Sequence, residues 1–264
     1  MNNALTETQL MEMAPSIFTD QAHSSRSTRY AHVPTIEVIK QLRKQGYVPT
    51  EAKESALRSK HADRLNYQRH FVRLRQREYL EQSKKVGTVV PELLLINSHD
   101  GSSSFRMSAG LFRFICSNGM VVQSADYGSI ILQHLGDELM GAVREASEQI
   151  AGQMPKIIRA TEAWDKIKMS HSQRVSFAKR ALDLRYGQQH IPVTPSDILT
   201  PRRNEDEAPT LWRTFNVIQE HLTQGGPEGK SEKGRSVKVR SIKSVNNILH
   251  FNRGLWEMAE KIAA

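Results

Sequence analysis

The chain lacks several features that would fix its chemistry at once. It has a single cysteine among 264 residues, so neither an intrachain disulfide nor a cysteine-rich zinc site can form. No apolar run approaches the roughly 18 residues of a membrane span, and the first residues lack the basic start and apolar stretch of a signal peptide. We therefore expect a cytoplasmic protein of a reducing compartment, with no membrane partner.

Motifs for nucleotide hydrolysis are also missing. Neither GxxxxGK[ST] nor GxGxxG occurs, so the sequence gives no reason to expect a bound nucleotide or any other cofactor. Cys116 follows the apolar pair Phe114-Ile115 and has no adjacent basic residue to activate it. This setting favours a buried structural thiol over a nucleophile.

Strand signals dominate the middle of the chain. Two runs rich in apolar residues, 93–96 and 105–115, are separated by a group of turn formers, and Asn118-Gly119 predicts a further tight turn. An alternating segment at 66–77 precedes them, and 130–132 is a shorter apolar run after them. These segments predict an antiparallel meander of four or five strands over about residues 66–134.

Helical periodicity lies on both sides of this meander. It is clearest at 35–45, at 137–157 (where Pro155 should kink or split the helix) and at 211–222. We expect an α+β fold in which the meander packs against long helices and the C-terminal half is largely helical. The predicted organisation is a single domain, 1–264, made of a basic helix and meander at 30–135 and a helical half at 136–264, with a mobile basic loop at 226–243.

Positive charge is unevenly spread. The formal net charge is +9, and residues 21–90 alone hold 15 Lys or Arg against six Asp or Glu. The loop 226–243 lacks apolar periodicity and is rich in Gly, Ser and Lys, so it cannot order itself by burying apolar surface. A basic surface is typical of proteins that bind a polyanion such as nucleic acid, and a basic protein with no such partner is the alternative.

The segment 66–77 predicts where such a surface lies. As a strand it places Val72 and Leu74 on one face and a row of arginines on the other, and it holds no acidic residue to neutralise them. Each guanidinium offers a planar fork of donors for phosphate, and Phe71 could stack on a base; a solvated outer face is the alternative. The predicted nucleic-acid-binding residues are Arg69, Phe71, Arg73, Arg75, Arg77, Arg106 and Arg113 on the sheet, and Lys230, Lys233, Arg235, Lys238, Arg240 and Lys243 on the loop.

A polar turn between two predicted strands invites three interpretations. It consists of Asn97, Ser98, His99, Asp100, Gly101, Ser102 and Ser103, and its Asp-Gly step suits a positive φ. The turn can be purely structural, its amides can cup a phosphate, or His99 can act as a base or metal ligand beside Asp100. No second His or carboxylate stands nearby at metal-ligand spacing, so we predict no metal and favour the structural interpretation.

The same stretch carries a family resemblance. The string NSHDGSSSF followed by GLFRFICSNGMVV resembles the YfjQ/YafZ/YubP family of prophage- and plasmid-encoded proteins. Further matching segments occur in the same order: SRSTRY at 25–30, VPT at 33–35, PVTP at 192–195, TPRR at 200–203 and LW at 255–256. The resemblance covers nearly the whole chain and implies a protein of a mobile genetic element, but no activity, because the family is uncharacterised.

A second resemblance is one of architecture alone. A sheet with a basic face, backed by long helices, resembles the general plan of Redβ/RecT-type single-strand annealing proteins, although no motif supports it. Our first hypothesis is a non-enzymatic protein that binds nucleic acid, specifically single-stranded DNA, for annealing or recombination, as a homo-oligomer. The alternative is an interaction factor that binds an acidic protein, and the third is a metal-dependent enzyme using His99 and Asp100.

Overall fold

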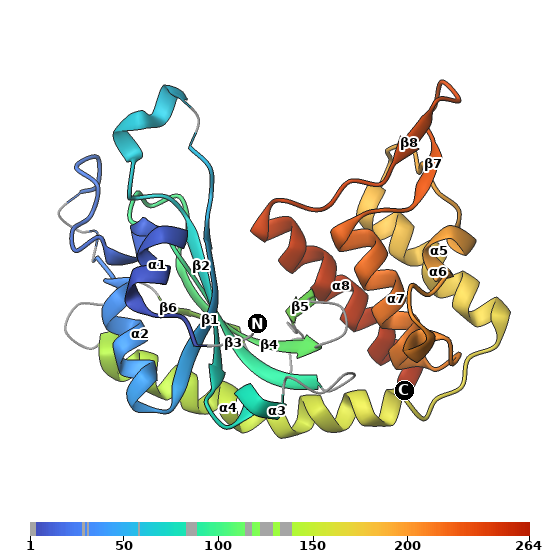
Figure 1. The fold of residues 1–264 in the computed structure, drawn as a ribbon, viewed down its shortest axis with the longest axis horizontal. Helices are drawn as coiled ribbons and strands as arrows, with labels where there is room; N and C mark the ends of the chain where they lie inside the picture. Colours follow the sequence, from blue (N-terminus) through green and yellow to red (C-terminus); the bar gives the residue numbers. More distant parts are fainter. Residues whose placement is uncertain are drawn as a thin grey trace. The chain divides into compact units, whose positions relative to one another are not determined.

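The computed structural model describes residues 4–27, 30, 32–57, 59–82, 89–113, 118–121, 129–132 and 139–264. We expected one domain, and the chain divides into two compact units (Figure 1). The first comprises Met1–Gly119 and Ala125–Met154, and the second Met120–Ser124 and Pro155–Ala264. The predicted α+β class is confirmed, with an antiparallel sheet and a mostly helical C-terminal half.

In the described part of the chain, the sheet has six strands. They are β1 (Tyr47–Glu54), β2 (His70–Gln76), β3 (Val89–Asn97), β4 (Phe105–Arg113), β5 (Asn118–Val121) and β6 (Ser129–Leu132). The order is β1-β2-β3-β4-β5, and β6 pairs with β4. The β1/β2, β2/β3, β3/β4 and β4/β6 pairs are antiparallel, as the predicted meander requires.

Strand β1 lies before the predicted meander. Its sequence YVPTEAKE is charged and contains Pro49, which cannot donate a ladder hydrogen bond and so obscures the strand pattern. The register with β2 shifts between Pro49 and Glu51, and β1 ends the strand order, so the proline occupies an irregular position of an edge strand.

One face of the sheet forms the core of the first unit. Val72 and Leu74 of β2 are fully buried, as are their cross-strand partners Leu95 and Leu93 on β3. The helical elements of this unit are α1 (Glu7–Met13), η1 (Pro15–Phe18), α2 (Thr35–Lys44), η2 (Ser59–Arg64), α3 (Tyr79–Gln82) and the first part of α4 (Leu139–Trp164). Helices α1 and α2 contact β1, so they cover the sheet near its edge.

Among the residues that the structure describes, the second unit is helical apart from one hairpin and the end of β5, which begins in the first unit. The other elements of the second unit are the end of α4, α5 (His171–Tyr186), α6 (Pro195–Leu199), η4 (Asn204–Asp206), α7 (Leu211–Gln224), β7 (Glu228–Lys230), β8 (Ser236–Lys238) and α8 (Val245–Ala263). Four buried aromatic residues from three helices form its centre: Trp164, Trp212, Phe215 and Trp256. Helix α4 continues through Pro155 and is not split there. Within the described residues, no helix has both the length and the apolarity needed to cross a bilayer.

The basic segment 226–243 takes regular structure. Strands β7 and β8 pair as an antiparallel hairpin, with Gly234 at φ +72° in its turn. The Lys230 amide donates to the Pro192 carbonyl at 2.8 Å, and a Cβ on Gly229 would lie 1.9 Å from the same oxygen. The prediction that this segment cannot order itself is wrong, because backbone hydrogen bonds and a close approach that needs glycine replace the missing apolar burial.

Candidate functional site

The arginines of β2 do not form an exposed row. Arg73 is 7% exposed and Arg75 is 2% exposed. Between them lies Glu92 of β3, which is 0% exposed and accepts from Arg73 Nη1 at 2.7 Å and from Arg75 Nε at 2.5 Å. Glu51 of β1 lies 3.1 Å from Arg73 Nε. The prediction of unneutralised guanidiniums is wrong here, because the carboxylates come from the two neighbouring strands and not from the segment itself.

The other predicted sheet residues are dispersed. Arg69 is half-buried and donates to the Ser102 carbonyl, and Phe71 is half-buried beneath the ammonium of Lys53, 5.8 Å from its ring centroid. Arg77 is exposed in the turn after β2, and Arg106 is half-buried on β4. The side chain of Arg113 lies outside the described residues. The structure therefore assembles no continuous arginine surface from the described side chains of this sheet.

The polar turn between β3 and β4 is largely internal. Its first four residues are buried: Asn97, Ser98, His99 and Asp100. The Asn97 amide donates to the Val33 carbonyl and to Thr35 Oγ1, both at 3.0 Å. The backbone of His99 accepts from the His23 amide at 2.9 Å and donates to the Tyr67 carbonyl at 3.1 Å. The turn thus ties the segment before α2 to the sheet.

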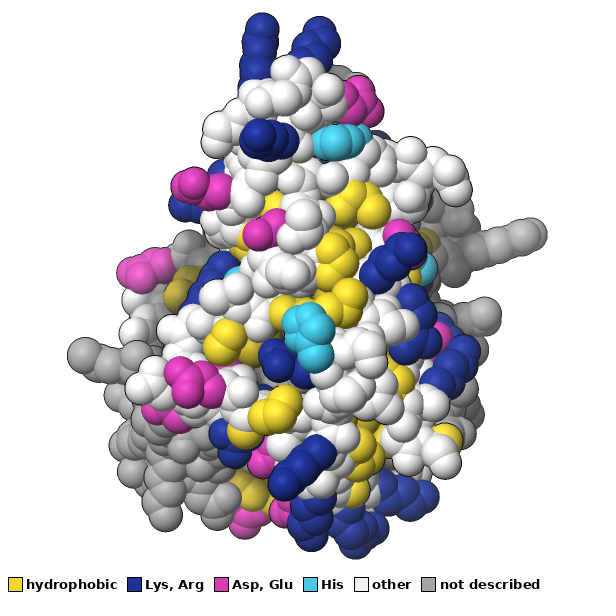
Figure 2. All heavy atoms as spheres, turned by 90° about the vertical axis from the view of Figure 1, so that its right-hand side faces the viewer, with side chains coloured by type: hydrophobic (Ala, Val, Ile, Leu, Met, Phe, Trp, Pro, Cys, Tyr) yellow, Lys and Arg dark blue, Asp and Glu magenta, His cyan; other side chains and the backbone are white. Residues whose placement is uncertain are grey.

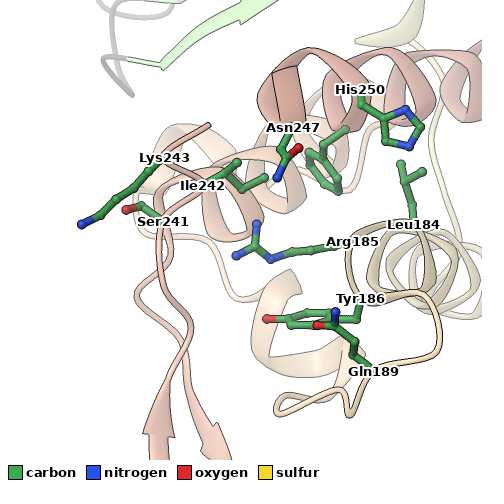
Figure 3. Close-up of a pocket in the computed structure, with 10 residues that line it drawn as sticks. Leu184, Arg185, Tyr186, Gln189, Ser241, Ile242, Lys243, Asn247 and His250 are labelled. Atoms are coloured by element: carbon green, nitrogen blue, oxygen red, sulfur yellow. The ribbon is translucent and has the colours of Figure 1, made fainter. Parts of the chain in front are cut away.

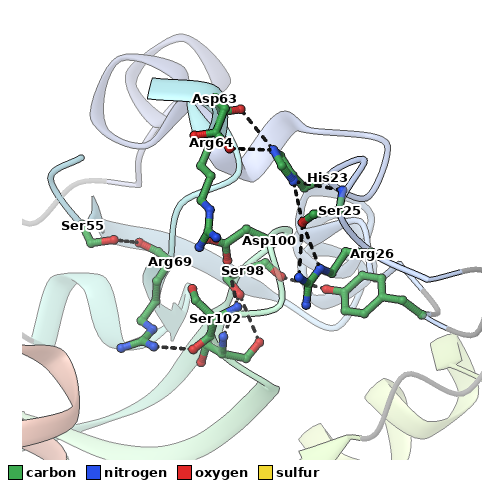
Figure 4. A network of polar contacts seen from close by, with 12 residues as sticks. His23, Ser25, Arg26, Ser55, Asp63, Arg64, Arg69, Ser98, Asp100 and Ser102 are labelled. Atoms are coloured by element: carbon green, nitrogen blue, oxygen red, sulfur yellow. Dashed lines mark hydrogen bonds and ion pairs between the residues drawn. The ribbon is translucent and has the colours of Figure 1, made fainter. Parts of the chain in front are cut away.

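Two of the amides predicted to cup a phosphate already have acceptors within the turn. Ser102 N donates to Asp100 Oδ1 and Ser103 N donates to Ser98 Oγ, each at 2.8 Å (Figure 4). Gly101 has φ +73°, as the Asp-Gly step predicts, and a Cβ there would lie 2.5 Å from Arg26 Nη1. The Ser102 and Ser103 amides are therefore not available to a phosphate, and these bonds agree with the structural interpretation of the turn.

Three histidines meet at the base of this turn. His99 Nδ1 lies 2.8 Å from His32 Nε2, and the His99 ring centroid lies 5.1 Å from that of His70. His70 is 1% exposed, its Nε2 lies 2.8 Å from Thr35 Oγ1, and burial lowers its pKa to about 4. Among the described residues, no group of three or more His, Cys, Asp or Glu side chains is arranged to hold a metal ion. A neutral, hydrogen-bonded His70 belongs to the packing of the unit.

A pocket of about 460 Å³ opens beside the turn. It is lined by Ser55, Ala56, Leu57, His61, Arg64, Gln68, Arg69, Asp100 and Ser102. Burial acts to raise the pKa of Asp100, but hydrogen bonds from Ser102 and the charge of Arg64 hold it below its ordinary value. Arg64 Nη1 lies 3.5 Å from Asp100 Oδ2, so part of the positive charge in this pocket is already neutralised.

The predicted loop residues, in contrast, all reach solvent. Six side chains in and just after the hairpin are exposed, and none of them forms an ion pair with another described residue: Lys230, Lys233, Arg235, Lys238, Arg240 and Lys243. We call them the hairpin cations. On the face drawn in Figure 2, Lys and Arg side chains lie at the end of the hairpin.

Charge is concentrated in the second unit. That unit holds 19 Lys or Arg against 12 Asp or Glu, whereas the first holds 18 against 16. The formal net charge of +9 thus divides into +7 on the second unit and +2 on the first. The count over 21–90 overstated the basicity of the first unit, because the acids that balance it, such as Glu92, lie elsewhere in the sequence.

Comparisons with known proteins identify the family. A family model described as a domain of unknown function, DUF932, matches residues 22–256. The chain is 36% identical to UPF0380 protein YafZ and 35% identical to UPF0380 protein YfjQ, both of Escherichia coli (strain K12), over 98% of this chain and 91% of each relative. The chain belongs to the DUF932 family, within the YfjQ/YafZ group that the sequence motifs indicated. No solved structure matches it.

Proposed function

We propose that this protein binds nucleic acid, as a single strand of DNA, through its second unit and without catalysis. The observation that carries the proposal is the set of six exposed hairpin cations, which have no ion pair among the described residues. Exposed Lys and Arg side chains without an ion pair are available to neutralise phosphates, which releases the counterions condensed on the nucleic acid. The net charge of +7 on the same unit adds long-range attraction for a polyanion.

The hairpin presents these charges in a favourable way. Its backbone is fixed by the hydrogen bond from the Lys230 amide to the Pro192 carbonyl and, just beyond β8, by the bond from the Ile242 amide to the Thr223 carbonyl, each 2.8 Å long. A fixed backbone lowers the conformational entropy lost on binding compared with a disordered segment of the same composition. Two carboxylates, Glu228 and Glu232, also lie on the hairpin, so residues 226–243 carry a net charge of +4.

Salt dependence of binding tests the proposal. For a single strand, the slope of log K against log salt is about −0.7 for each phosphate neutralised, so six contacts predict a slope of about −4. Fluorescence anisotropy of a labelled 20-nucleotide strand at several salt concentrations measures that slope. Absence of binding even at low salt, or a slope near zero, would contradict the proposal.

A matched pair of variants locates the interface. The triple variant Lys233→Glu, Arg235→Glu, Lys238→Glu reverses three hairpin cations, and losing three contacts should make the slope less steep by about 2. The control Lys40→Glu, Lys44→Glu, Lys53→Glu changes net charge by the same amount at exposed sites of the first unit. If the control weakens binding as much as the hairpin variant, the interface is not the hairpin.

Annealing would require more than attraction. Complementary strands must be held with their bases free to pair, which a non-catalytic backbone-binding surface on a homo-oligomer would permit. Strand annealing measured by fluorescence quenching, alongside the mass of the protein in solution, tests this extension of the proposal.

A further inference from the structure

A pocket of about 410 Å³ lies in the second unit beside the hairpin cations. Its lining comprises Leu184, Arg185, Tyr186, Gln189, Ser241, Ile242, Lys243, Asn247, His250 and Phe251 (Figure 3). No Asp or Glu is among these lining residues, unlike the pocket beside the turn of the first unit, which Asp100 lines. The volume falls within the range of about 300–1,000 Å³ typical of ligand pockets.

Arg185 is the central cation of this pocket. Figure 3 shows its side chain extending across the pocket between Tyr186 and Asn247. Its Nη2 donates to the Arg240 carbonyl at 2.6 Å, which fixes the guanidinium, while its Nε is buried and has no hydrogen-bond partner among the described residues. Leaving a buried donor unsatisfied costs about 1–3 kcal/mol, so a ligand that accepts from Nε gains affinity by removing that cost.

The N-terminus of α8 borders the same pocket. Lys243 and Asn247 stand on either side of the N-cap residue Ser244, and both line the pocket. The Ser244 side chain makes no capping hydrogen bond, so the first turn of α8 is not closed by its own cap. The amides and dipole of a helix N-terminus favour an anion, and here they act together with the cationic side chains of Arg185 and Lys243.

The anion is best matched by the phosphate of a nucleotide. Tyr186 is half-buried, and the Arg185 guanidinium carbon lies 5.4 Å from its ring centroid, so the ring and the planar guanidinium stand together in the pocket. Aromatic rings and Arg planes are the surfaces on which unpaired bases stack. Asn247 and Gln189 add amide groups that can donate to and accept from a base edge.

Building on the proposed function, we infer that this pocket holds one nucleotide of a single strand, with its phosphate at Arg185 and the N-terminus of α8 and its base against Tyr186. In a duplex the bases are stacked and paired, so none can enter the pocket without unpairing. The pocket would then give the preference for single strands that the exposed hairpin cations alone, which contact only the backbone, do not supply.

An abasic strand tests the base contact directly. A 20-nucleotide oligothymidylate and an abasic strand of the same length present the same phosphates, so only the former can stack. Wild-type protein should bind the oligothymidylate about 5-fold to 150-fold more tightly, the range expected for stacking of one base. Tyr186→Leu should remove that difference by weakening only the oligothymidylate complex, whereas Tyr186→Phe, which keeps the ring, should retain it. Arg185→Gln should weaken both complexes through the phosphate.

The outcomes separate the two proposals. Equal wild-type affinities for the two strands would overturn the inference and leave the hairpin interface standing, and this comparison needs no variant to fold. An equal loss for both strands in a folded Tyr186→Leu variant would also overturn it. Failure to bind either strand at low salt would instead refute the proposed function itself.

Discussion

Removing the Glu92 carboxylate should destabilise the first unit strongly, and more than removing the Glu51 carboxylate. Glu92 is fully buried and is bonded to two buried arginines, Arg73 at 2.7 Å and Arg75 at 2.5 Å. The variant Glu92→Gln keeps the size of the side chain but takes away the charge that offsets both guanidiniums. Removing one partner of a buried ion pair costs about 3–5 kcal/mol, because a buried charge loses its compensation.

The surroundings of the two arginines indicate where in this range the loss of stability should lie. Arg73 retains Glu51, whose carboxylate lies 3.1 Å from its Nε and whose side chain is 33% exposed. Arg75 is 2% exposed and loses the carboxylate beside its Nε. We expect a loss of about 4 kcal/mol. For a unit of this size each kcal/mol lowers Tm by about 2–4 °C, so Tm should fall by roughly 8–16 °C.

Thermal and urea unfolding followed by circular dichroism measure the loss. The matched control is Glu51→Gln, which removes a half-exposed partner of Arg73 and should cost about 1 kcal/mol or less. Replacing all three buried charges, as Arg73→Met, Arg75→Met and Glu92→Leu together, should recover much of the stability, because an apolar cluster of similar volume needs no compensation. A Glu92→Gln protein within 1 kcal/mol of wild type would refute the reasoning.

Three further predictions follow from single sites. Burial lowers the pKa of His70 to about 4 from 6.5, so the stability that this neutral side chain contributes is complete above pH 6.5 and is lost as pH falls toward 4. Urea unfolding from pH 7 to 4 should show the free energy of unfolding fall by up to about 3 kcal/mol, and this fall should be absent in His70→Gln. Gly229→Ala places a Cβ 1.9 Å from the Pro192 carbonyl oxygen and should detach the hairpin, which would speed amide hydrogen exchange at Lys230. The control Gly234→Ala meets no atom within 4 Å and should cost only about 1–2 kcal/mol of backbone strain. Asn97→Ala leaves the Val33 carbonyl without its side-chain donor and should lower the free energy of unfolding by about 1–3 kcal/mol. Substitution of the exposed Ser104 should change the free energy of unfolding by less than about 0.5 kcal/mol.

The sheet could be predicted from sequence because its central strands are apolar and its turns carry Gly. Leu93 to Ile96 and the Asp100-Gly101 step signal a strand and the turn that follows it, whatever the rest of the chain does. Strand β1 could not be found in this way, since a proline and three charged residues mask its pattern and its pairing with β2 is a long-range property. The hairpin β7–β8 was missed for a related reason, because its strands are three residues long and polar.

The fate of the β2 arginines shows what a one-dimensional charge pattern omits. Alternation along 69–77 correctly separates Val72 from Arg73, but it does not tell which carboxylates lie opposite. Glu92 is 19 positions from Arg73 in sequence and adjacent to it in space, so pairing depends on the β2/β3 register. A local search for acids cannot detect such a partner, whereas the acids of the hairpin, Glu228 and Glu232, lie within the basic segment itself.

The hydrogen bonds already made by the turn 97–103 limit which of its polar groups could hold a ligand. A polar group can hold a ligand only with donors or acceptors that the protein has not already used. In this turn Asn97 donates twice, Ser98 Oγ both donates and accepts, and the Ser102 and Ser103 amides are bonded within the turn itself. The string that most clearly marks the family therefore supports the architecture of the first unit. Arg185 Nε and the hairpin cations, by contrast, retain donors without partners among the described residues, and a polyanion would supply the acceptors that these groups lack.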